Sequence, residues 1–198
     1  MNNIDNFYTE DVEEFSKSYF SYLKDIFFKV DLSEIKSFIK VLLAAREHGA
    51  TVFFVGNGGS AATASHFAND LAFGTNEYEK PFRVMSITDN VAVLTALGND
   101  YGYDEIFIRQ LKIYGKKGDV LIGVSASGNS KNLINAFEYA NTAEIKTVAL
   151  TAFDGGKMRE ISDYSIHIQT DKNEYGPAED MHMILDHLVC NYLMRLVK

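Results

Sequence analysis

The sequence lacks the features that exported and disulfide-stabilised proteins share. Its only cysteine, Cys190, has no second cysteine with which to form an internal disulfide bond. Residues 1–15 contain neither the basic start nor the apolar segment of a secretory signal. Together these two absences predict a protein of the reducing cytoplasm.

Long apolar runs and blocks of like charge are missing too. The longest apolar candidates are strand-sized, such as 51–55, whereas a membrane-spanning helix needs about 20 apolar residues. The net charge is −8, and no block of like charges stands out along the chain. We therefore expect no membrane association and no nucleic-acid partner.

Two nucleotide-binding motifs do not occur. The glycines at 56–59 have the order G-N-G-G, which does not match G-x-G-x-x-G, and no acidic residue ends a second strand at the usual place. The phosphate-binding motif G-x-x-x-x-G-K-[ST] is absent as well. Dinucleotide and nucleoside-triphosphate binding are therefore both disfavoured.

What is present suffices for one domain of ordinary size. With 198 residues, of which 46% are hydrophobic and 23% charged, the chain can bury a single core, and it has neither an internal repeat nor a low-complexity linker. Helical periodicity covers residues 9–29 and 32–48, with Gly49 at the expected C-terminal cap. We predict one domain, in which residues 1–48 form an N-terminal helical hairpin and residues 49–198 an α/β core.

The second part of the chain alternates short β-rich runs with helical stretches. The runs lie at 51–55, 82–87, 119–125, 146–151 and 164–168. Because they are nearly continuously apolar, they predict a five-stranded parallel sheet of flavodoxin-like order, covered on both faces in a three-layer α/β sandwich. Ligands of such folds bind beyond the carboxyl ends of the strands.

A long helix is predicted over residues 178–197. Its apolar stripe consists of Met181, Ile184, Leu185, Leu188, Tyr192 and Leu196. Together with the N-terminal helices it offers more apolar surface than one sheet face needs, which favours a homo-oligomer. The alternative is that these helices only cover the sheet.

Two loops follow predicted strands and open predicted helices. The glycine loop (Gly56–Ser60) gives backbone N–H groups close access to a ligand, although glycine-rich turns also join strands to helices in proteins that bind nothing there. The serine loop (Ser125–Ser130) has the sequence S-A-S-G-N-S. A helix cap needs only one serine, so three of them favour a phosphate site built from hydroxyls, backbone N–H groups and the helix dipole.

Residue types that bind metals cluster on two predicted helices. His66 and Asp70 are four residues apart and therefore share a helix face. The last helix holds Glu179, Asp180, His182, Asp186 and His187 in its first turns. Two histidines and two carboxylates suit Zn²⁺, with Mn²⁺ or Fe²⁺ as alternatives. Taken alone, His66 is more often a satisfied histidine near a core, and His48 and His167 have no such neighbours.

Together these motifs resemble those of the sugar isomerase domain family and, within it, the phosphoheptose isomerases. The matching segments are G-N-G-G-S at 56–60, H-F-A-N-D at 66–70, G-N-D-Y-G-Y at 98–103, S-A-S-G-N-S at 125–130, and L-T with D-G-G-K-M within 150–158. The resemblance runs over nearly the whole chain. It implies conversion of sedoheptulose 7-phosphate to D-glycero-D-manno-heptose 7-phosphate, toward the nucleotide-activated heptose of lipopolysaccharide, capsule or S-layer glycans. It also implies a homotetramer with sites shared between subunits.

The resemblance assigns roles to individual residues. Substrate contacts fall to Asn57, Gly58, Gly59, Ser60, Asp70, Asn99, Asp100 and Glu179 around the sugar, and to Ser125, Ala126, Ser127 and Ser130 in the phosphate loop. Zinc is expected on His66, Asp70, Glu179 and His187. Ala126 stands where threonine is frequent, which removes one donor to the phosphate.

Two of the four expected ligands depart from the family pattern. Asp70 replaces a glutamate, and Glu179 replaces a glutamine, which adds a negative charge that favours a divalent cation. For the isomerisation we expect Asp70 to be the base, with Glu179 in its place if Asp70 is committed to the metal. His187 is the expected acid, and Zn²⁺ is expected to polarise the substrate oxygens.

Two other interpretations remain open. The family includes a member that binds the bacterial replication initiator as a non-catalytic tetrameric scaffold, but the presence here of His66, His187 and two carboxylates favours an enzyme. The departures at Asp70 and Glu179 also leave open a branch that isomerises another ketose phosphate.

Overall fold

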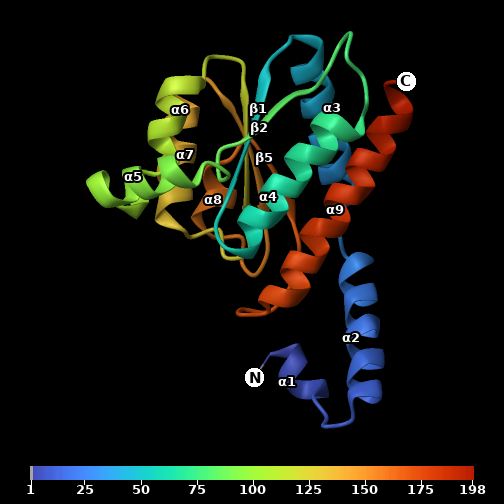
Figure 1. Cartoon of the computed structure of the whole chain (residues 1–198). Helices are drawn as coiled ribbons and strands as arrows, with labels where there is room; N and C mark the ends of the chain where they lie inside the picture. The colour runs from blue at the N-terminus through green and yellow to red at the C-terminus, as the bar shows by residue number, and fades with distance from the viewer. Residues whose placement is uncertain (1) are drawn as a thin grey trace.

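A computed structural model describes residues 2–198 and places a five-stranded sheet at the centre of the molecule (Figure 1). The strands are β1 (Thr51–Gly56), β2 (Arg83–Ser86), β3 (Val120–Ser125), β4 (Lys146–Thr151) and β5 (Tyr164–His167). Neighbouring strands are parallel throughout, in the order β2-β1-β3-β4-β5. The prediction of a parallel, flavodoxin-like sheet is confirmed, and each predicted strand lies within about one residue of its observed bounds.

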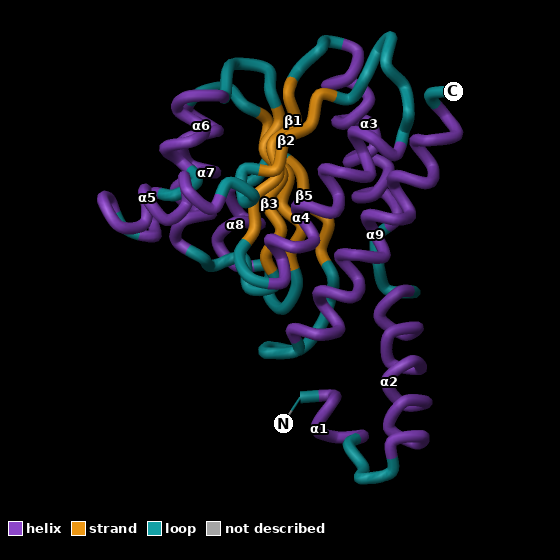
Figure 2. Tube along the Cα trace, in the orientation of Figure 1, coloured by secondary structure: helices purple, strands orange, loops and turns teal. Residues whose placement is uncertain are grey.

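Helices cover both faces of the sheet, which confirms the predicted three-layer sandwich (Figure 2). One layer contains α5 (Val91–Tyr101), α6 (Ile108–Tyr114), α7 (Lys131–Thr142) and α8 (Gly156–Ile161), with the 3-10 turn η2 (Tyr103–Glu105). The other contains α3 (Leu32–Glu47), α4 (Gly59–Asn69) and α9 (Tyr175–Leu196). Each layer has its own apolar core against the sheet. Within residues 2–198, no helix is both long and apolar enough to cross a membrane.

The central strands form where apolar residues run continuously. All six residues of β3 are buried, and so are residues 52–56 of β1. A strand buried on both faces of a parallel sheet favours such a run. Because β1 and β3 are parallel neighbours, the glycine loop and the serine loop begin at the same edge of the sheet.

Aromatic packing fixes the rotation of α4 about its own axis. Phe67 is fully buried, with its ring centroid 4.9 Å from that of Phe54 on β1 and 5.8 Å from that of Phe38 on α3. Successive helical residues are about 100° apart, so anchoring Phe67 in the core leaves His66 on the flank of α4 that faces α9. The helix continues as the π-helix η1 (Asp70–Gly74), a wider turn that is frequent at functional sites.

The predicted N-terminal hairpin is wrong. Helix α2 (Val12–Phe27) points away from the body of the molecule and packs against α1 (Asn3–Phe7) and α9 instead of lying along α3 (Figure 1). Of its sixteen residues, Ile26 alone is buried. The periodicity that predicts an amphipathic helix does not say which surface the apolar side covers.

Hydrogen bonds to the start of α9 hold α2 in this position. The hydroxyl of Tyr19 donates to Asp180 Oδ2 at 2.5 Å, and the hydroxyl of Tyr22 donates to Glu174. Burial, followed by the neighbouring carboxylate, raises the pKa of both phenols well above the usual range, so both remain donors. Glu174 is fully buried and also accepts from the backbone N–H of Asn3 at 2.7 Å. These contacts join α1 and α2 to α9.

Candidate functional site

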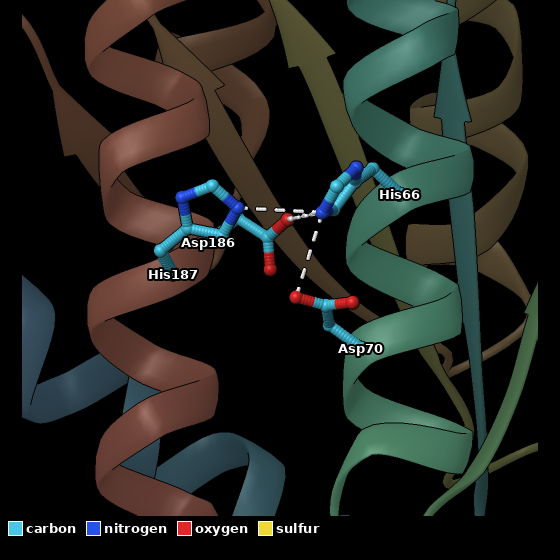
Figure 3. Close-up of side chains that lie close together, drawn as sticks. All are labelled: His66, Asp70, Asp186 and His187. Carbon is cyan, nitrogen blue, oxygen red and sulfur yellow. Dashed lines mark hydrogen bonds and ion pairs between the residues drawn. The ribbon is translucent and has the colours of Figure 1, made fainter.

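Four side chains with metal-binding atoms face one another between α4 and α9 (Figure 3). They are His66, Asp70, Asp186 and His187, and one donor atom from each lies within 4.8 Å of all the others. The Nε2 atoms of the two histidines are 3.3 Å apart. Nε2 of His66 is also 3.5 Å from Asp70 Oδ2 and 3.9 Å from Asp186 Oδ2. We refer to these residues as the four-residue group.

The spacings of the four-residue group fit one divalent cation. Zinc binds nitrogen and oxygen ligands at about 2.0–2.2 Å, which places neighbouring donors of a tetrahedron roughly 3.3–3.6 Å apart. Two imidazoles and two carboxylates also suit Mn²⁺ and Fe²⁺. The side chain of His66 is 44% exposed and that of Asp70 is 23% exposed, so a small molecule can reach the group from one side.

Asp186 provides the strongest structural sign of a cation site. Its side chain is fully buried, and Oδ1 accepts a hydrogen bond from the Cys190 thiol at 3.3 Å. Among residues 2–198, Oδ2 has no hydrogen-bond partner. Burial raises the pKa of Asp186 to about 6, which shows how unfavourable its charge is there without a counter-ion. A buried carboxylate oxygen is stable when it is paired or coordinates a metal.

The structure brings together three of the four predicted metal ligands and adds Asp186. Glu179 lies outside the group: its carboxylate packs on Gly59, where an added Cβ would stand 2.3 Å from Glu179 Oε2. The free N–H groups of the α4 N-terminus favour a carboxylate at that place. One signal in the sequence pointed to Asp186, because this acid interrupts the apolar stripe of the last helix, next to Leu185 and one turn before Cys190.

The glycine loop makes a tight turn that opens the N-terminus of α4. A Cβ at Gly56 would lie 2.4 Å from the carbonyl oxygen of Ser60, so only glycine fits. Gly58 has φ +55°, a conformation that side chains rarely adopt. The loop therefore depends on both glycines for its shape.

Asn57 links the glycine loop to two other parts of the chain. Its side-chain amide exchanges two hydrogen bonds with that of Asn132, at 3.0 and 2.9 Å. Asn57 Oδ1 also accepts from the hydroxyl of Tyr103 at 2.8 Å, which brings the G-N-D-Y-G-Y motif to the same edge of the sheet. Nothing in the sequence singles out Asn132, because the pair joins the glycine loop to the first turn of α7, 75 positions away.

The serine loop keeps its hydroxyl groups available. Ser125 Oγ accepts from the N–H of Gly128 at 3.1 Å, and Ser127 Oγ accepts from the N–H of Asn129 at 3.3 Å. As acceptors, both hydroxyls retain their hydrogen for a ligand. Ser130 is the N-cap residue of α7, yet its side chain makes no capping hydrogen bond. The three hydroxyls and the helix N-terminus form a suitable anion site.

The turn before α8 supports the serine loop from behind. A Cβ at Gly128 would lie 2.0 Å from the carbonyl oxygen of Gly155. The carbonyl of Gly128 accepts from the N–H of Met158 at 2.9 Å, and Asn129 Oδ1 accepts from the N–H of Lys157 at 3.0 Å. The serine loop is therefore held in shape by a second segment of the chain.

Asn99 and Asp100 are exposed near the end of α5. Asn99 Nδ2 donates to Asp100 Oδ1 at 2.8 Å, so the two side chains contact each other. Neither belongs to the four-residue group. Tyr103, from the same motif, is the residue that reaches the glycine loop.

Comparisons with known proteins identify the family of the chain. The family model of the SIS domain matches residues 17–152. Phosphoheptose isomerases from Helicobacter pylori and Aliarcobacter butzleri are 38% and 40% identical to the chain, over 81% and 78% of its length and 83% and 80% of theirs. The chain belongs to the phosphoheptose isomerase family. A solved phosphoheptose isomerase structure from Neisseria gonorrhoeae has a TM-score of 0.82 and 29% identity, covering 92% of this chain and 98% of that one.

The two departures from the phosphoheptose isomerase pattern have different structural outcomes. Asp70, although one methylene shorter than glutamate, still places Oδ2 3.5 Å from His66 Nε2. Glu179 lies at Gly59, and the second carboxylate of the four-residue group comes from Asp186 instead. Three carboxylates, those of Asp70, Glu179 and Asp186, therefore lie between α4 and α9.

Proposed function

We propose that this chain isomerises sedoheptulose 7-phosphate to D-glycero-D-manno-heptose 7-phosphate. The observation that carries the proposal is the four-residue group, two histidines and two carboxylates, in a chain of the phosphoheptose isomerase family. His66 follows Gly59 by seven residues, so the group lies roughly 10 Å along α4 from the glycine loop. A phosphate loop and a glycine loop at one edge of the sheet, together with a cation site between α4 and α9, suit an open-chain sugar phosphate.

The serine loop is the proposed phosphate site. Ser125, Ser127 and Ser130 supply hydroxyl donors, and the N-terminus of α7 supplies backbone N–H groups. Holding the phosphate far from C1 and C2 orients the reacting end of the sugar without taking part in the chemistry. Ala126 is buried and contributes backbone only.

A divalent cation is the proposed cofactor, Zn²⁺ first and Mn²⁺ or Fe²⁺ as alternatives. His66, Asp70, Asp186 and His187 would hold it, and when bound it supplies Lewis-acid stabilisation of the negative charge that develops on the substrate oxygens. Glu179, predicted as a ligand, faces the glycine loop in this chain and is available for substrate.

Isomerisation moves a proton from C1 to C2 of the sugar through an enediolate. The sequence predicts Asp70 as the base, but its carboxylate faces the other three donors of the group. We therefore assign the proton transfer between carbons to Glu179, the alternative base, which lies outside the group. By the same argument His187, the predicted acid, is assigned to the cation site alone, because its Nε2 lies 3.3 Å from His66 Nε2 within the four-residue group.

We propose that the protein acts in the cytoplasm as a homotetramer, in the synthesis of heptose for surface glycans such as lipopolysaccharide or capsule. Exposed apolar side chains on and next to α2 support assembly: Phe20 is 68% exposed and Phe28 is 75% exposed. Large aromatic side chains in such positions are favourable when another subunit covers them.

The decisive experiment follows sedoheptulose 7-phosphate by NMR with the purified protein, once loaded with Zn²⁺ and once after chelation. We expect the aldose phosphate to form only in the metal-loaded sample. No product in either sample would contradict the proposal. Turnover of a different ketose phosphate would keep the reaction class and replace the substrate.

The variants Asp70→Asn and Glu179→Gln separate the two base assignments. If Glu179 is the base, Glu179→Gln loses turnover by at least about 100-fold and retains Zn²⁺ affinity, whereas Asp70→Asn loses both. If Asp70→Asn instead loses turnover and retains Zn²⁺ affinity, while Glu179→Gln loses both, the base is Asp70.

A further inference from the structure

Asp186 and Cys190 lie one turn apart on α9, on the same face of the helix. The thiol donates to Asp186 Oδ1 at 3.3 Å, and both side chains are fully buried. The Cys190 thiol thus donates a hydrogen bond to a carboxylate that is buried away from water. A cysteine that served only as an apolar filler would need no such partner.

The two carboxylate oxygens of Asp186 differ in their hydrogen bonds. Oδ1 is held by Cys190, whereas Oδ2 points toward His66, at 3.9 Å, and has no hydrogen-bond partner among residues 2–198 (Figure 3). Fixing Oδ1 removes the rotation about the last side-chain bond that would turn Oδ2 away. The carboxylate is therefore presented with its free oxygen toward the two histidines.

We infer that Cys190 is a positioning residue, whose thiol holds Asp186 in the orientation that makes it the fourth ligand of a divalent cation. The inference rests on the cation site of the proposed function. Cys190 is itself outside the four-residue group, so it acts through Asp186 and does not contact the cation. Partners of this kind orient metal ligands, and their loss typically weakens metal affinity by about 10–100-fold.

The test measures Zn²⁺ affinity by competition with a chromogenic chelator, and the absorption spectrum of the Co²⁺-loaded protein. We expect Cys190→Ala to weaken Zn²⁺ binding by about tenfold or more. Cys190→Ser, which keeps a donor, should stay within about threefold of the parent protein. Asp186→Asn should bind Zn²⁺ at least as weakly as Cys190→Ala.

Val189→Ala is the control for packing. Val189 is the buried neighbour of Cys190 on α9, and its truncation leaves a cavity without removing a donor from Asp186. We expect this variant to lower Tm and to leave Zn²⁺ affinity unchanged. Equal losses of affinity in Val189→Ala and Cys190→Ala would show that Cys190 only fills space, and would overturn the inference.

Three other results would also overturn it: unchanged affinity in Cys190→Ala, a thiolate charge-transfer band in the Co²⁺ spectrum that Cys190→Ser abolishes, or a parent protein that binds neither ion. Isomerase activity of the same parent sample is recorded separately. An active parent with unaltered affinity in Cys190→Ala refutes the positioning role alone. An inactive parent whose affinity depends on Cys190 refutes the proposed reaction alone.

Discussion

The carboxylate of Glu179 packs directly on the α-carbon of Gly59, so that an added Cβ would stand 2.3 Å from Oε2 and 2.6 Å from Oε1. The contact joins the second turn of α9 to the first turn of α4. A side chain at position 59 would therefore have to displace the Glu179 carboxylate. The conflict comes from this neighbouring carboxylate and not from the backbone angles of Gly59, because its φ is not positive.

Gly59→Ala should therefore impair turnover without unfolding the protein. The new methyl group pushes the Glu179 carboxylate out of place, and we expect kcat to fall by at least about tenfold, equivalent to roughly 1.4 kcal/mol. Alanine is a better helix former than glycine, so Tm should not fall. Steady-state kinetics and a thermal melt of the same sample measure both effects.

Gly58→Ala is the matched control for this prediction. Nothing lies within 4 Å of a Cβ at position 58, but its φ of +55° is unfavourable for alanine by about 1–2 kcal/mol. This variant should lose stability and keep the Glu179 contact. If Gly59→Ala retains full kcat, Glu179 is not the base.

Ser127→Ala should raise KM for the sugar phosphate more than it lowers kcat. The serine loop is the proposed site of the phosphate, at the end of the substrate that does not react, and losing one hydrogen bond to a charged phosphate costs about 1.5–3 kcal/mol of binding. We expect KM to rise by roughly tenfold or more. Ser37→Ala is a suitable control, because Ser37 lies on α3 and its hydroxyl donates to the Ser33 carbonyl. An unchanged KM in Ser127→Ala would move the phosphate site elsewhere.

Asp186→Asn should change stability in opposite directions with and without metal. In the metal-free protein the substitution removes a buried charge with a free oxygen, and we expect Tm to rise by about 2–4 °C, which corresponds to roughly 1 kcal/mol for a chain of this size. In the presence of Zn²⁺ we expect the parent to gain stability by binding the ion and the variant to gain much less. Differential scanning calorimetry with and without Zn²⁺ measures both.

Asp25→Asn provides the comparison for charge alone, since Asp25 is exposed on α2. It should leave both Tm values nearly unchanged. A metal-free Asp186→Asn protein that melts well below the parent would mean that the carboxylate is needed for the fold itself.

His182 should make the protein less stable in acid. Its ring is fully buried, and burial lowers the pKa of His182 to about 4, against an ordinary value of 6.5. Between these values the unfolded chain binds the proton and the folded chain does not, so this stabilisation is complete above pH 6.5 and is lost as pH falls toward 4. Between pH 7 and pH 5 the loss amounts to about 2 kcal/mol.

Urea unfolding of His182→Met at several pH values tests this assignment. Methionine has a similar volume and no charge, so the variant should lose most of the slope between pH 7 and pH 5. His167, whose pKa is also lowered by burial, contributes a slope of the same sign that both proteins keep. His48→Gln, at an exposed helix end, should keep the full slope. A parental slope in His182→Met would place the titrating group elsewhere.

The sheet and the positions of the glycine and serine loops could be predicted because their signals are local. An unbroken apolar run such as 120–124 predicts a buried strand by itself, and three serines in one loop already exceed what a helix cap needs. His66 and Asp70 were recognisable as partners because a spacing of four residues on one helix fixes their relative position.

Features that depend on contacts between distant elements could not be predicted. The choice of Asp186 over Glu179 in the four-residue group follows from how α9 is rotated against α4, which no spacing within α9 reveals. The direction of α2 depends on the hydroxyl of Tyr22 reaching the buried Glu174, 152 positions away in the sequence. Helical periodicity is the same whichever surface the helix covers.

Because the serine loop contacts the turn before α8, a change of sequence in one of these segments has to be matched by a change in the other. Gly128 touches Gly155 so closely that neither backbone can shift alone, and Asn129 bonds to Lys157, 28 positions further along the chain. A serine loop taken from another sugar isomerase would pack against a turn, residues 154–158, whose shape fits the present loop. Changing the preferred sugar phosphate through this loop therefore requires that residues 125–130 and 154–158 be exchanged together.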